Sequence, residues 1–425
     1  MSVFAKAKAR RSRSLKSLIG GIAIVGVSAI VLSGCGAPAE EGGSSSSGPA
    51  QDLSLKLGTA LPVTGNLAFL GPPEIAGGEY AVSEINAADL GIQIELVQGD
   101  SGDTDNKAYE TEIPRLLGED VKAILGAASS GVSLQFIDQV TGAGVIQFSP
   151  ANTSAAFSTY DDNGLYFRTA PSDVLQGEVL GNLIAESGAE TLGMIVLNDS
   201  YGTGLAGFTK KAFEAAGGEV VAETTYNTGD TTFDAQISEV RAADPDAIAL
   251  ITFEEVSTII PGLSGYPADH LYFVDGNLAN FGTTFPAGTL TGAKGTLPGL
   301  SVDTIKDFTG ALNEFWIGEG NSKLENFSYA AESYDSVILL ALASMEAGST
   351  DSDKIAAKLQ EVSGGSGKGK KCTTFADCAA IINDGGTVDY DGISGPITLD
   401  DVGDPTEATI GIYQYGEDNN YTAVK

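Results

Sequence analysis

The chain has 425 residues, with 23 basic and 56 acidic side chains, one histidine and a formal net charge of −33 at pH 7. So acidic a chain repels nucleic acid and anionic lipid headgroups, which argues against both as direct partners and favours solubility. The length is too great for one compact core and suits two or three domains, of which we expect two lobes.

The first 34 residues have the pattern of a secretory signal. Six basic side chains and no acidic one accompany an apolar run from Ile19 to Leu32. This run has 14 residues, whereas a helix needs about 20 to cross a bilayer core. A permanent transmembrane anchor is therefore the weaker interpretation, and we predict that residues 1–34 direct export and are removed.

A possible lipid attachment site follows the apolar run. Leu32-Ser33-Gly34-Cys35 resembles the bacterial lipobox, in which a small residue precedes a cysteine that receives diacylglycerol on its thiol. Residues 35–51 are rich in Gly, Ser, Ala and Glu without apolar periodicity, which predicts a flexible linker. The expected location is the extracytoplasmic face of the cell membrane, with the membrane contacted through the lipid on Cys35 only.

From residue 52 onward, short Val/Ile/Leu runs alternate with stretches of helical period, which is typical of a parallel sheet covered on both faces. The first series predicts strands at 53–62, 92–98, 121–126 and 145–149, with helices at 72–88, 106–117 and 130–140. The second series predicts strands at 191–198, 219–226, 247–253 and 271–276, with helices at 174–187, 205–216 and 233–241 and one more before residue 271. Two such series predict two doubly wound sheets.

The remaining elements predict that the chain returns to each lobe. Residues 294–299 lack a helical period and are expected to form a crossing segment. Helices at 305–316, 329–347 and 353–361 follow, and the last 40 residues have the alternation of a hairpin. We expect lobe 1 to comprise 52–170 with 300–383 and lobe 2 to comprise 171–299 with 384–425, joined by a hinge of several strands.

Two further cysteines, Cys372 and Cys378, lie in a polar segment with five residues between them. In an oxidising compartment an even pair predicts a disulfide. Zinc is the alternative, but His270 is the only histidine and is far away in sequence, so four ligands are not available. We therefore expect a disulfide and no metal site.

Several short motifs follow the predicted strands and helices in a fixed order. They are Leu61-Pro62-Val63-Thr64-Gly65, the Asp-rich loop 100–105, Gly126 to Ser130, Ser149-Pro150-Ala151-Asn152-Thr153, Asp199-Ser200-Tyr201-Gly202 and Tyr334-Asp335. Their order and spacing resemble the branched-chain amino-acid-binding proteins of ABC transporters, which have the type I periplasmic binding protein fold, and the resemblance covers essentially all of the chain after residue 51. It implies an α/β protein with two lobes that close over a small amino acid and deliver it to a permease.

The resemblance also implies a binding site at the ends of the strands. Ser130 and Thr153 match hydroxyls that hold the ligand carboxylate, with the carbonyls of Ala151 and Asn152 near its ammonium. Helix starts favour such an anion, although Ser or Thr at these positions is often only an N-cap.

From lobe 2, the resemblance implies that two aromatic residues and an acidic residue complete the site. Tyr201 and Phe253 match aromatic residues that close over the ligand. Asp275 matches the acidic partner of the ammonium, with Glu254 in reserve. Leu70 stands where an aromatic residue is frequent, which leaves the side-chain preference of the pocket open.

Other functions remain as alternatives. A ligand-sensing receptor component of the same fold is one. Another is an NAD-dependent oxidoreductase, because Gly202-Thr203-Gly204-Leu205-Ala206-Gly207 matches G-x-G-x-x-G, with Glu219 and Glu223 downstream. Four residues separate this motif from the apolar run of the preceding strand, and an exported protein meets little NAD. We therefore expect a binding protein that is not an enzyme and has no cofactor. We also expect it to be a monomer. The loop 100–105 lacks the Gly and distal Glu of a calcium loop.

Overall fold

The structure, a computed structural model, describes residues 52–424. The predicted signal peptide, Cys35 and the linker up to residue 51 lie outside the described residues. Between residues 52 and 424, no helix has both the length and the apolar character needed to cross a bilayer.

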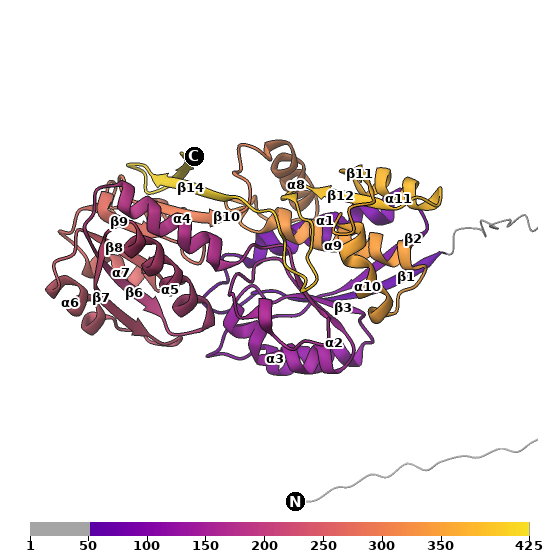
Figure 1. The fold of residues 1–425 in the computed structure, drawn as a ribbon, viewed down its shortest axis with the longest axis horizontal. Coiled ribbons are helices and arrows are strands. Elements are labelled where there is room, and N and C mark those ends of the chain that lie inside the picture. The colour runs from indigo at the N-terminus through magenta and orange to yellow at the C-terminus, as the bar shows by residue number, and fades with distance from the viewer. Residues whose placement is uncertain (1–51, 425) are drawn as a thin grey trace, which may run out of the picture. The chain divides into compact units, whose positions relative to one another are not determined.

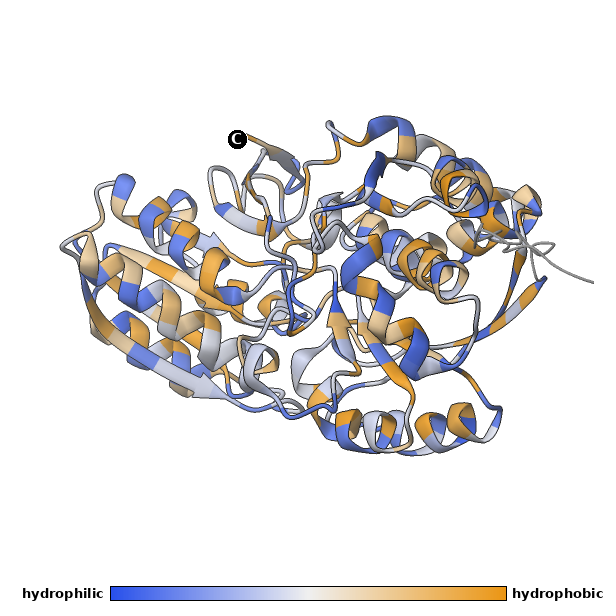
Figure 2. Ribbon diagram, turned by 45° about the vertical axis from the view of Figure 1, so that its right-hand side comes forward, coloured by the Kyte–Doolittle hydropathy of each residue, from blue (hydrophilic) through white to orange (hydrophobic). Residues whose placement is uncertain are grey.

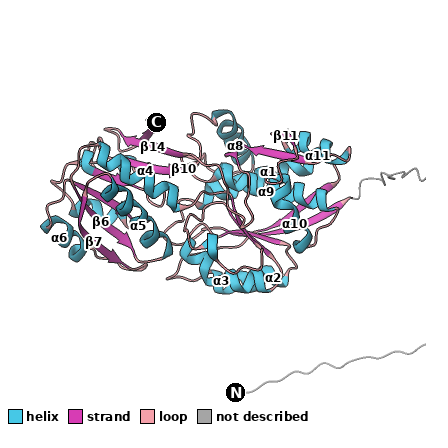
Figure 3. Cartoon of the chain, in the orientation of Figure 1, coloured by secondary structure: helices cyan, strands magenta, loops and turns pink. Residues whose placement is uncertain are grey.

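Lobe 1 is built on a five-stranded parallel sheet in the order β2-β1-β3-β4-β5 (Figures 1 and 3). Its strands are β1 (Leu53–Ala60), β2 (Ile92–Val97), β3 (Ala123–Gly126), β4 (Ile146–Ser149) and β5 (Tyr166–Arg168). The second strand in this order, β1, places Leu57 opposite Leu96 of β2 on one side and opposite Ala123 of β3 on the other. Every residue of β3 and β4 is buried, as expected for strands covered on both faces.

The helices of lobe 1 form two groups. They are α1 (Gly71–Ala88), α2 (Tyr109–Gly118), α3 (Ser130–Gly142), α8 (Lys306–Gly318), α9 (Ala330–Ala347), α10 (Ser352–Val362) and α11 (Phe375–Asn383). α1, α10 and α11 pack around α9, α8 packs on α1, and α2 and α3 pack on each other. α9 is buried continuously from Ala330 to Ser344, because neighbours cover it on all sides.

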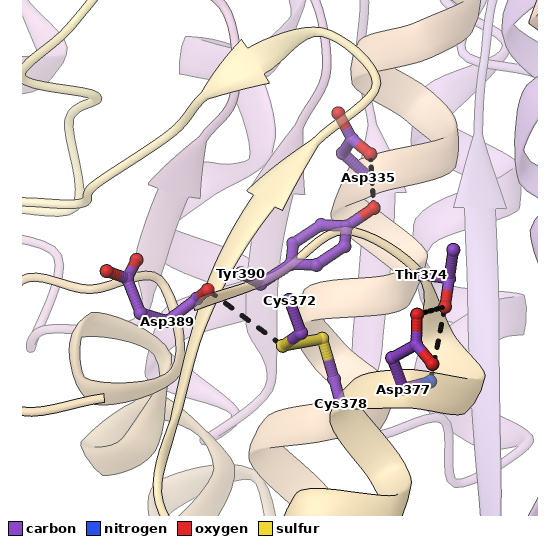
Figure 4. The surroundings of a disulfide bond; sticks show 7 residues. All are labelled: Asp335, Cys372, Thr374, Asp377, Cys378, Asp389 and Tyr390. Atoms are coloured by element: carbon purple, nitrogen blue, oxygen red, sulfur yellow. Dashed lines mark hydrogen bonds between the residues drawn. A yellow bond between two sulfur atoms is a disulfide. The ribbon is translucent and has the colours of Figure 1, made fainter. Parts of the chain in front are cut away.

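A small sheet of β11 (Lys370–Cys372), β12 (Val388–Gly392) and β13 (Gly395–Pro396) packs beside α11. Cys372 and Cys378 are joined by the predicted disulfide, with their Cα atoms 5.4 Å apart (Figure 4). The bond connects β11 to α11. Asp335 of α9 accepts a 2.7 Å hydrogen bond from the Tyr390 hydroxyl, which attaches β12 to the core of lobe 1 (Figure 4).

Lobe 2 contains a seven-stranded sheet in the order β15-β14-β10-β9-β8-β6-β7. Its strands are β6 (Thr191–Leu197), β7 (Glu219–Tyr226), β8 (Ala247–Ile251), β9 (Leu271–Phe273), β10 (Lys294–Pro298), β14 (Ile410–Tyr415) and β15 (Tyr421–Ala423). β6 to β10 pair in parallel, whereas β14 is antiparallel to β10 and to β15. The predicted C-terminal hairpin is therefore the edge of this sheet.

Four α-helices belong to lobe 2: α4 (Asp173–Glu186), α5 (Ser200–Ala215), α6 (Asp234–Ala242) and α7 (Val256–Gly262). Three short 3-10 helices, η1 (Phe157–Thr159), η2 (Ala268–His270) and η3 (Gly282–Thr284), complete the described elements. α4 approaches α5 closely because Gly177 has no side chain: a Cβ there would lie 2.4 Å from Cβ of Phe208. Apolar residues of the strands and the packed helices form one continuous core (Figure 2).

The chain crosses between the lobes three times, after β5, after β10 and between β13 and β14. Two predicted features differ from this arrangement. Residues 294–298 are strand β10 within the sheet, and the crossing begins after them. Residues 388–396, which we expected in lobe 2, pair with β11 and pack against α10 and α11 of lobe 1, so the third crossing comes later than residue 384.

Arg168 at the end of β5 connects the first and third crossings. The guanidinium is completely buried and donates from Nε to Asp404 Oδ1 at 2.6 Å and from Nη2 to Asp404 Oδ2 at 2.7 Å. Nη1 donates to the carbonyl oxygens of Asn152 and Ser154 at 3.1 and 2.8 Å. A rigid bidentate ion pair of this kind fixes the loop after β4 against the hinge.

Candidate functional site

A small enclosed cavity, hereafter the interlobe cavity, lies between loops of the two lobes. It is lined by Leu67, Leu70, Ala128, Ser129, Ser130, Ala151, Thr153, Tyr201, Phe253, Asp275, Gly276 and Tyr329. Its volume is about 10 Å³, which is room for about one water molecule. A ligand as large as an amino acid therefore requires the lobes to separate.

The lobe 1 side of the interlobe cavity offers hydroxyl groups at the start of α3. Ser129 is the N-cap of this helix and accepts from the Val132 amide at 3.3 Å. Ser130 is thus not needed as the cap: its buried Oγ accepts from the Ser154 amide at 3.2 Å. The Ser130 hydroxyl proton remains available beside the positive end of α3, which suits a carboxylate ligand.

The loop after β4 brings Ala151 and Thr153 to the same cavity. Thr153 is almost completely buried, and its carbonyl oxygen accepts from the Asp173 amide at 2.7 Å. This bond joins the loop to the start of α4 across the first crossing. The backbone of Thr153 is therefore attached to the start of lobe 2.

The lobe 2 side is aromatic and acidic. The rings of Tyr201, at the start of α5, and Phe253, after β8, stack with centroids 5.3 Å apart and an interplanar angle of 18°. Tyr201 donates its hydroxyl to Asp275 Oδ1 at 2.7 Å. These loops meet because the carboxyl ends of parallel strands share one edge of the sheet.

Within residues 52–424, Asp275 is the only carboxylate that lines the interlobe cavity. Besides Tyr201, the Gln176 amide donates to Oδ1 at 2.9 Å and the Tyr329 hydroxyl donates to Oδ2 at 2.7 Å. Burial raises the pKa of Asp275, and the donors from Tyr329, Tyr201 and Gln176 oppose that rise. No cation among the described residues forms an ion pair with it, so its charge is available to a cationic ligand group.

The structure brings seven of the nine predicted ligand-binding residues together at the interlobe cavity: Leu70, Ser130, Ala151, Thr153, Tyr201, Phe253 and Asp275. Asn152 is not among the lining residues: its carbonyl oxygen, which we expected near the ligand ammonium, accepts from Arg168 Nη1 at 3.1 Å. Its side chain is bonded to Ala127, Ala128 and Tyr166. Glu254 is exposed and also does not line the cavity. The predicted roles of Asn152 and Glu254 at the site are therefore corrected.

Tyr329 and Gln176 were missed by sequence reasoning. The predicted helix 329–347 includes Tyr329, but this residue precedes α9 with φ of +61°, a left-handed conformation that turns its side chain out of the helical path. Gln176 belongs to the first turn of α4 and is completely buried. Its only signal in the sequence is a polar residue on an otherwise apolar helix face.

The G-x-G-x-x-G segment does not have the geometry of a dinucleotide-binding turn. Its three glycines lie inside α5, and the N-cap Asp199 accepts from the Gly202 amide at 2.7 Å. A carboxylate thus occupies the helix start where a pyrophosphate would need free amides. Gly202 is required for packing, since a Cβ there would lie 2.1 Å from the Leu197 carbonyl oxygen.

The Asp-rich loop 100–105 is a structural feature. Asp100 accepts from the amides of Val63 and Thr64 at 3.1 Å, and Asp103 accepts from the Asn66 amide at 3.1 Å. These bonds fix the loop after β1 beside the cavity. Residues 52–424 contain no cluster of three or more His, Cys, Asp or Glu side chains suited to a metal ion.

Residues 54–381 match the sequence model of a family described as periplasmic binding proteins. A Leu/Ile/Val-binding protein homologue of Brucella abortus is 32% identical over 198 residues, which cover 46% of this chain and 53% of the relative. The match therefore spans about half the length of this curated relative. A chemotactic signal transduction substrate-binding protein, BasB of Halobacterium salinarum, is 25% identical over 354 residues, covering 81% of this chain and 83% of its own.

Solved structures show the same fold. The branched-chain amino acid transporter substrate-binding protein LivJ of Streptococcus pneumoniae, in complex with isoleucine, superposes with a TM-score of 0.70 at 24% identity. The superposition covers 88% of this chain and 99% of that structure. Because the family match extends over most of the chain and the two-lobed fold agrees with it, the chain belongs to the periplasmic binding protein family.

Proposed function

We propose that this protein is the extracytoplasmic solute-binding component of an ABC importer and that it binds a small amino acid in the interlobe cavity. The observation that carries the proposal is the position of Ser130 and Asp275, which face one cavity from opposite lobes. A hydroxyl at a helix start suits a carboxylate, and a buried carboxylate suits an ammonium group. The two groups of an amino acid match this pair.

Binding begins in an open form, in which the ligand carboxylate contacts Ser130 and Thr153 of lobe 1. Lobe 2 then closes with Tyr201, Phe253 and Asp275, and the ligand ammonium joins the donors around Asp275. Only contacts made in the closed form stabilise closure. The closed form is what a permease would recognise, and no covalent chemistry is needed, so we propose no enzymatic activity.

The names of the relatives support a branched-chain or similar amino acid as the ligand. Leu67, Leu70 and the Tyr201–Phe253 pair give the interlobe cavity an apolar lining that suits such a side chain. Ala128 and Ala151 leave space next to it. Urea and simple amides lack the carboxylate that Ser130 would hold, so they are expected to bind less well than amino acids.

A thermal-shift screen over the amino acids, short peptides, amides, urea and NAD tests the proposal. Stabilisation by one or a few amino acids is the expected result, since a ligand that binds only the folded protein raises the melting temperature. Stabilisation by NAD alone would contradict it and favour the oxidoreductase. Calorimetry on each ligand that passes the screen then gives affinity and stoichiometry.

A sensor component is the second candidate, supported by the name of the Halobacterium relative. Reconstitution with a permease separates the two: a transport component stimulates uptake of the ligand, and a sensor does not. Attachment through Cys35 is part of the proposal and is supported by the lipobox-like sequence. Mass spectrometry of membrane-purified protein should find an acylated N-terminal Cys35, and an intact unmodified Met1 would contradict it.

A further inference from the structure

Asp173, the first residue of α4, is a buried carboxyl group that the proposed binding mechanism does not yet use. Its side chain is completely buried, and neither carboxyl oxygen has a hydrogen-bond partner among the described residues. Its backbone amide, in contrast, donates to the Thr153 carbonyl oxygen at 2.7 Å. A buried unpaired carboxylate is costly, so the group requires an explanation.

The surroundings of Asp173 favour its neutral form. Burial raises its pKa well above the ordinary value, and the nearby charge of Asp275 raises it further. The Thr153 side chain lies close enough to this carboxyl group to oppose the rise, although no hydrogen bond of ordinary geometry joins the two. Arg168 also opposes the rise, and Asp199 adds to it. Arg168 is already engaged with Asp404 and with backbone carbonyls, so it does not neutralise Asp173 by direct pairing.

The protonation state of Asp173 matters because of Thr153. A hydroxyl has one proton to donate. Beside an ionised carboxylate, the Thr153 hydroxyl would donate to that carboxylate and could not donate to a ligand. Beside a neutral carboxyl group, Thr153 Oγ1 accepts the acid proton, and its own proton is free to point into the interlobe cavity.

We propose that Asp173 is a positioning residue for the binding site: as the neutral acid it donates to Thr153 Oγ1 and directs the Thr153 hydroxyl proton to the carboxylate of the ligand. This inference rests on the proposed function. It assigns to the start of α4 a role in distinguishing carboxylate ligands from ligands that lack a carboxylate. The backbone bond from the Asp173 amide to the Thr153 carbonyl oxygen keeps these two residues adjacent.

The test measures L-leucine affinity by calorimetry for the wild type, D173N, D173A, T153V and the double variant D173A/T153V. D173N keeps a donor at the position of the acid proton, so its affinity should stay within about threefold of the wild type. D173A and T153V should each lose about 10- to 100-fold. The double variant should be no weaker than T153V, because Asp173 acts through Thr153.

D162N is the matched control, because Asp162 is a buried carboxylate of lobe 1 that does not line the interlobe cavity.

A pH series from 5 to 8 adds a readout that a purely structural role would not change. Asp275, Asp199, Arg168 and Tyr201 surround Asp173 in both the wild type and D173N, so the ratio of their affinities isolates Asp173. Relative to D173N, the wild type should hold constant or weaken as the pH rises. A wild type that gains affinity over D173N with rising pH would show that the ionised form is the active one and would overturn the inference.

The remaining outcomes separate this inference from the proposed function. A D173N variant as weak as D173A, or a D173A variant as tight as the wild type, overturns the role of Asp173 while leaving amino-acid binding intact. A wild type that binds no amino acid overturns the proposed function itself. Thermal unfolding checks that each variant is folded, and if D173A is not, D173L, which fills the space of the carboxyl group without supplying a donor, replaces it in the comparison.

Discussion

Tyr329, immediately before α9 of lobe 1, donates its hydroxyl to Asp275 Oδ2 after β9 of lobe 2 at a distance of 2.7 Å. The bond is completely buried and spans the two lobes at the interlobe cavity. The left-handed conformation of Tyr329, with φ of +61°, is what brings the hydroxyl to this position. A non-glycine residue is strained in this conformation, and such strain persists only where surrounding contacts hold it. We therefore expect the bond between Tyr329 and Asp275 to stabilise the closed form.

Tyr329→Phe is therefore predicted to weaken ligand binding. The variant removes one of three donors to Asp275, and a hydrogen bond to a charged group contributes about 1.5 to 3 kcal/mol. The expected loss of leucine affinity is about 10- to 100-fold by calorimetry. Tyr160→Phe is the matched control: its hydroxyl also donates to a carboxylate, Asp138, at 3.0 Å, but on the exposed surface of lobe 1. Equal affinities for the Tyr329 variant and the wild type would show that this bond does not support closure.

Ser130→Ala and Asp275→Asn test the two ends of the proposed site. Each removes a charge-assisted hydrogen bond to the ligand, and each is expected to cost about 1.5 to 3 kcal/mol of binding free energy. Ser187→Ala serves as control, since Ser187 donates only to the Ile184 carbonyl oxygen at the end of α4. If calorimetry gives wild-type affinity for both variants, the assignment of the site is wrong.

The sequence predicted the lobes well because their strands are continuous apolar runs with clear boundaries. The range 219–226 agrees residue for residue with β7. Residues 294–299 lack a helical period, which led us to predict a crossing segment, and Gly295 and Pro298 are unfavourable in a strand. The place of β10 in the sheet is decided by β14, which pairs with it from more than a hundred residues later in the chain. Pairing between strands that are far apart in the sequence overrides local strand propensity, and a short stretch of sequence does not predict it.

The candidate site was predictable where residues follow a strand directly, as Ser130, Thr153 and Asp275 do. Asp173 lies just after the first crossing, and Tyr329 lies in the loop between α8 and α9, so their positions at the site depend on how the lobes are joined. Local sequence patterns carry no information on how the two lobes are joined. Asn152 shows the opposite case: its position in the motif is right, but its polar groups are all satisfied within lobe 1.

The disulfide between Cys372 and Cys378 is predicted to stabilise lobe 1 without affecting the ligand. The closed loop is short, with a sequence separation of 6, so the chain-entropy model gives it about 2 kcal/mol. Replacing both cysteines by Ser should lower the free energy of unfolding by up to about this amount in urea titrations. Leucine affinity should be unchanged, because neither β11 nor α11 contributes to the interlobe cavity. A change in affinity would mean that the small sheet is coupled to the hinge.

The last prediction concerns the pH dependence of stability at Asp199. This N-cap carboxylate of α5 faces Gly131 of lobe 1, where a Cβ would lie 2.7 Å from Oδ2. Burial raises the pKa of Asp199 to about 6, the amides of Gly202 and Tyr201 oppose the rise, and Glu255 adds to it. An acid whose pKa is raised in the native state lowers the free energy of unfolding when it is ionised, above about pH 6. This destabilisation decreases as the pH falls toward the ordinary pKa of an aspartic acid, near 4.

Asp199→Asn keeps a capping side chain but never ionises, so at pH 8 it should unfold at a higher temperature than the wild type. The gain is at most about 3 kcal/mol. It should shrink as the pH falls from 6 to 4 and vanish well below the ordinary pKa near 4, where the wild-type carboxyl group is neutral in both states. Asp246→Asn is the contrasting control, because hydrogen bonds from Thr191 lower the pKa of that exposed carboxylate. This second variant should lose stability at pH 8, with the loss shrinking as the pH falls through the lowered pKa. Thermal unfolding of the three proteins at pH 2, 4, 6 and 8 measures both trends. A D199N variant that melts with the wild type at every pH would show that Asp199 is not buried as the closed lobes require.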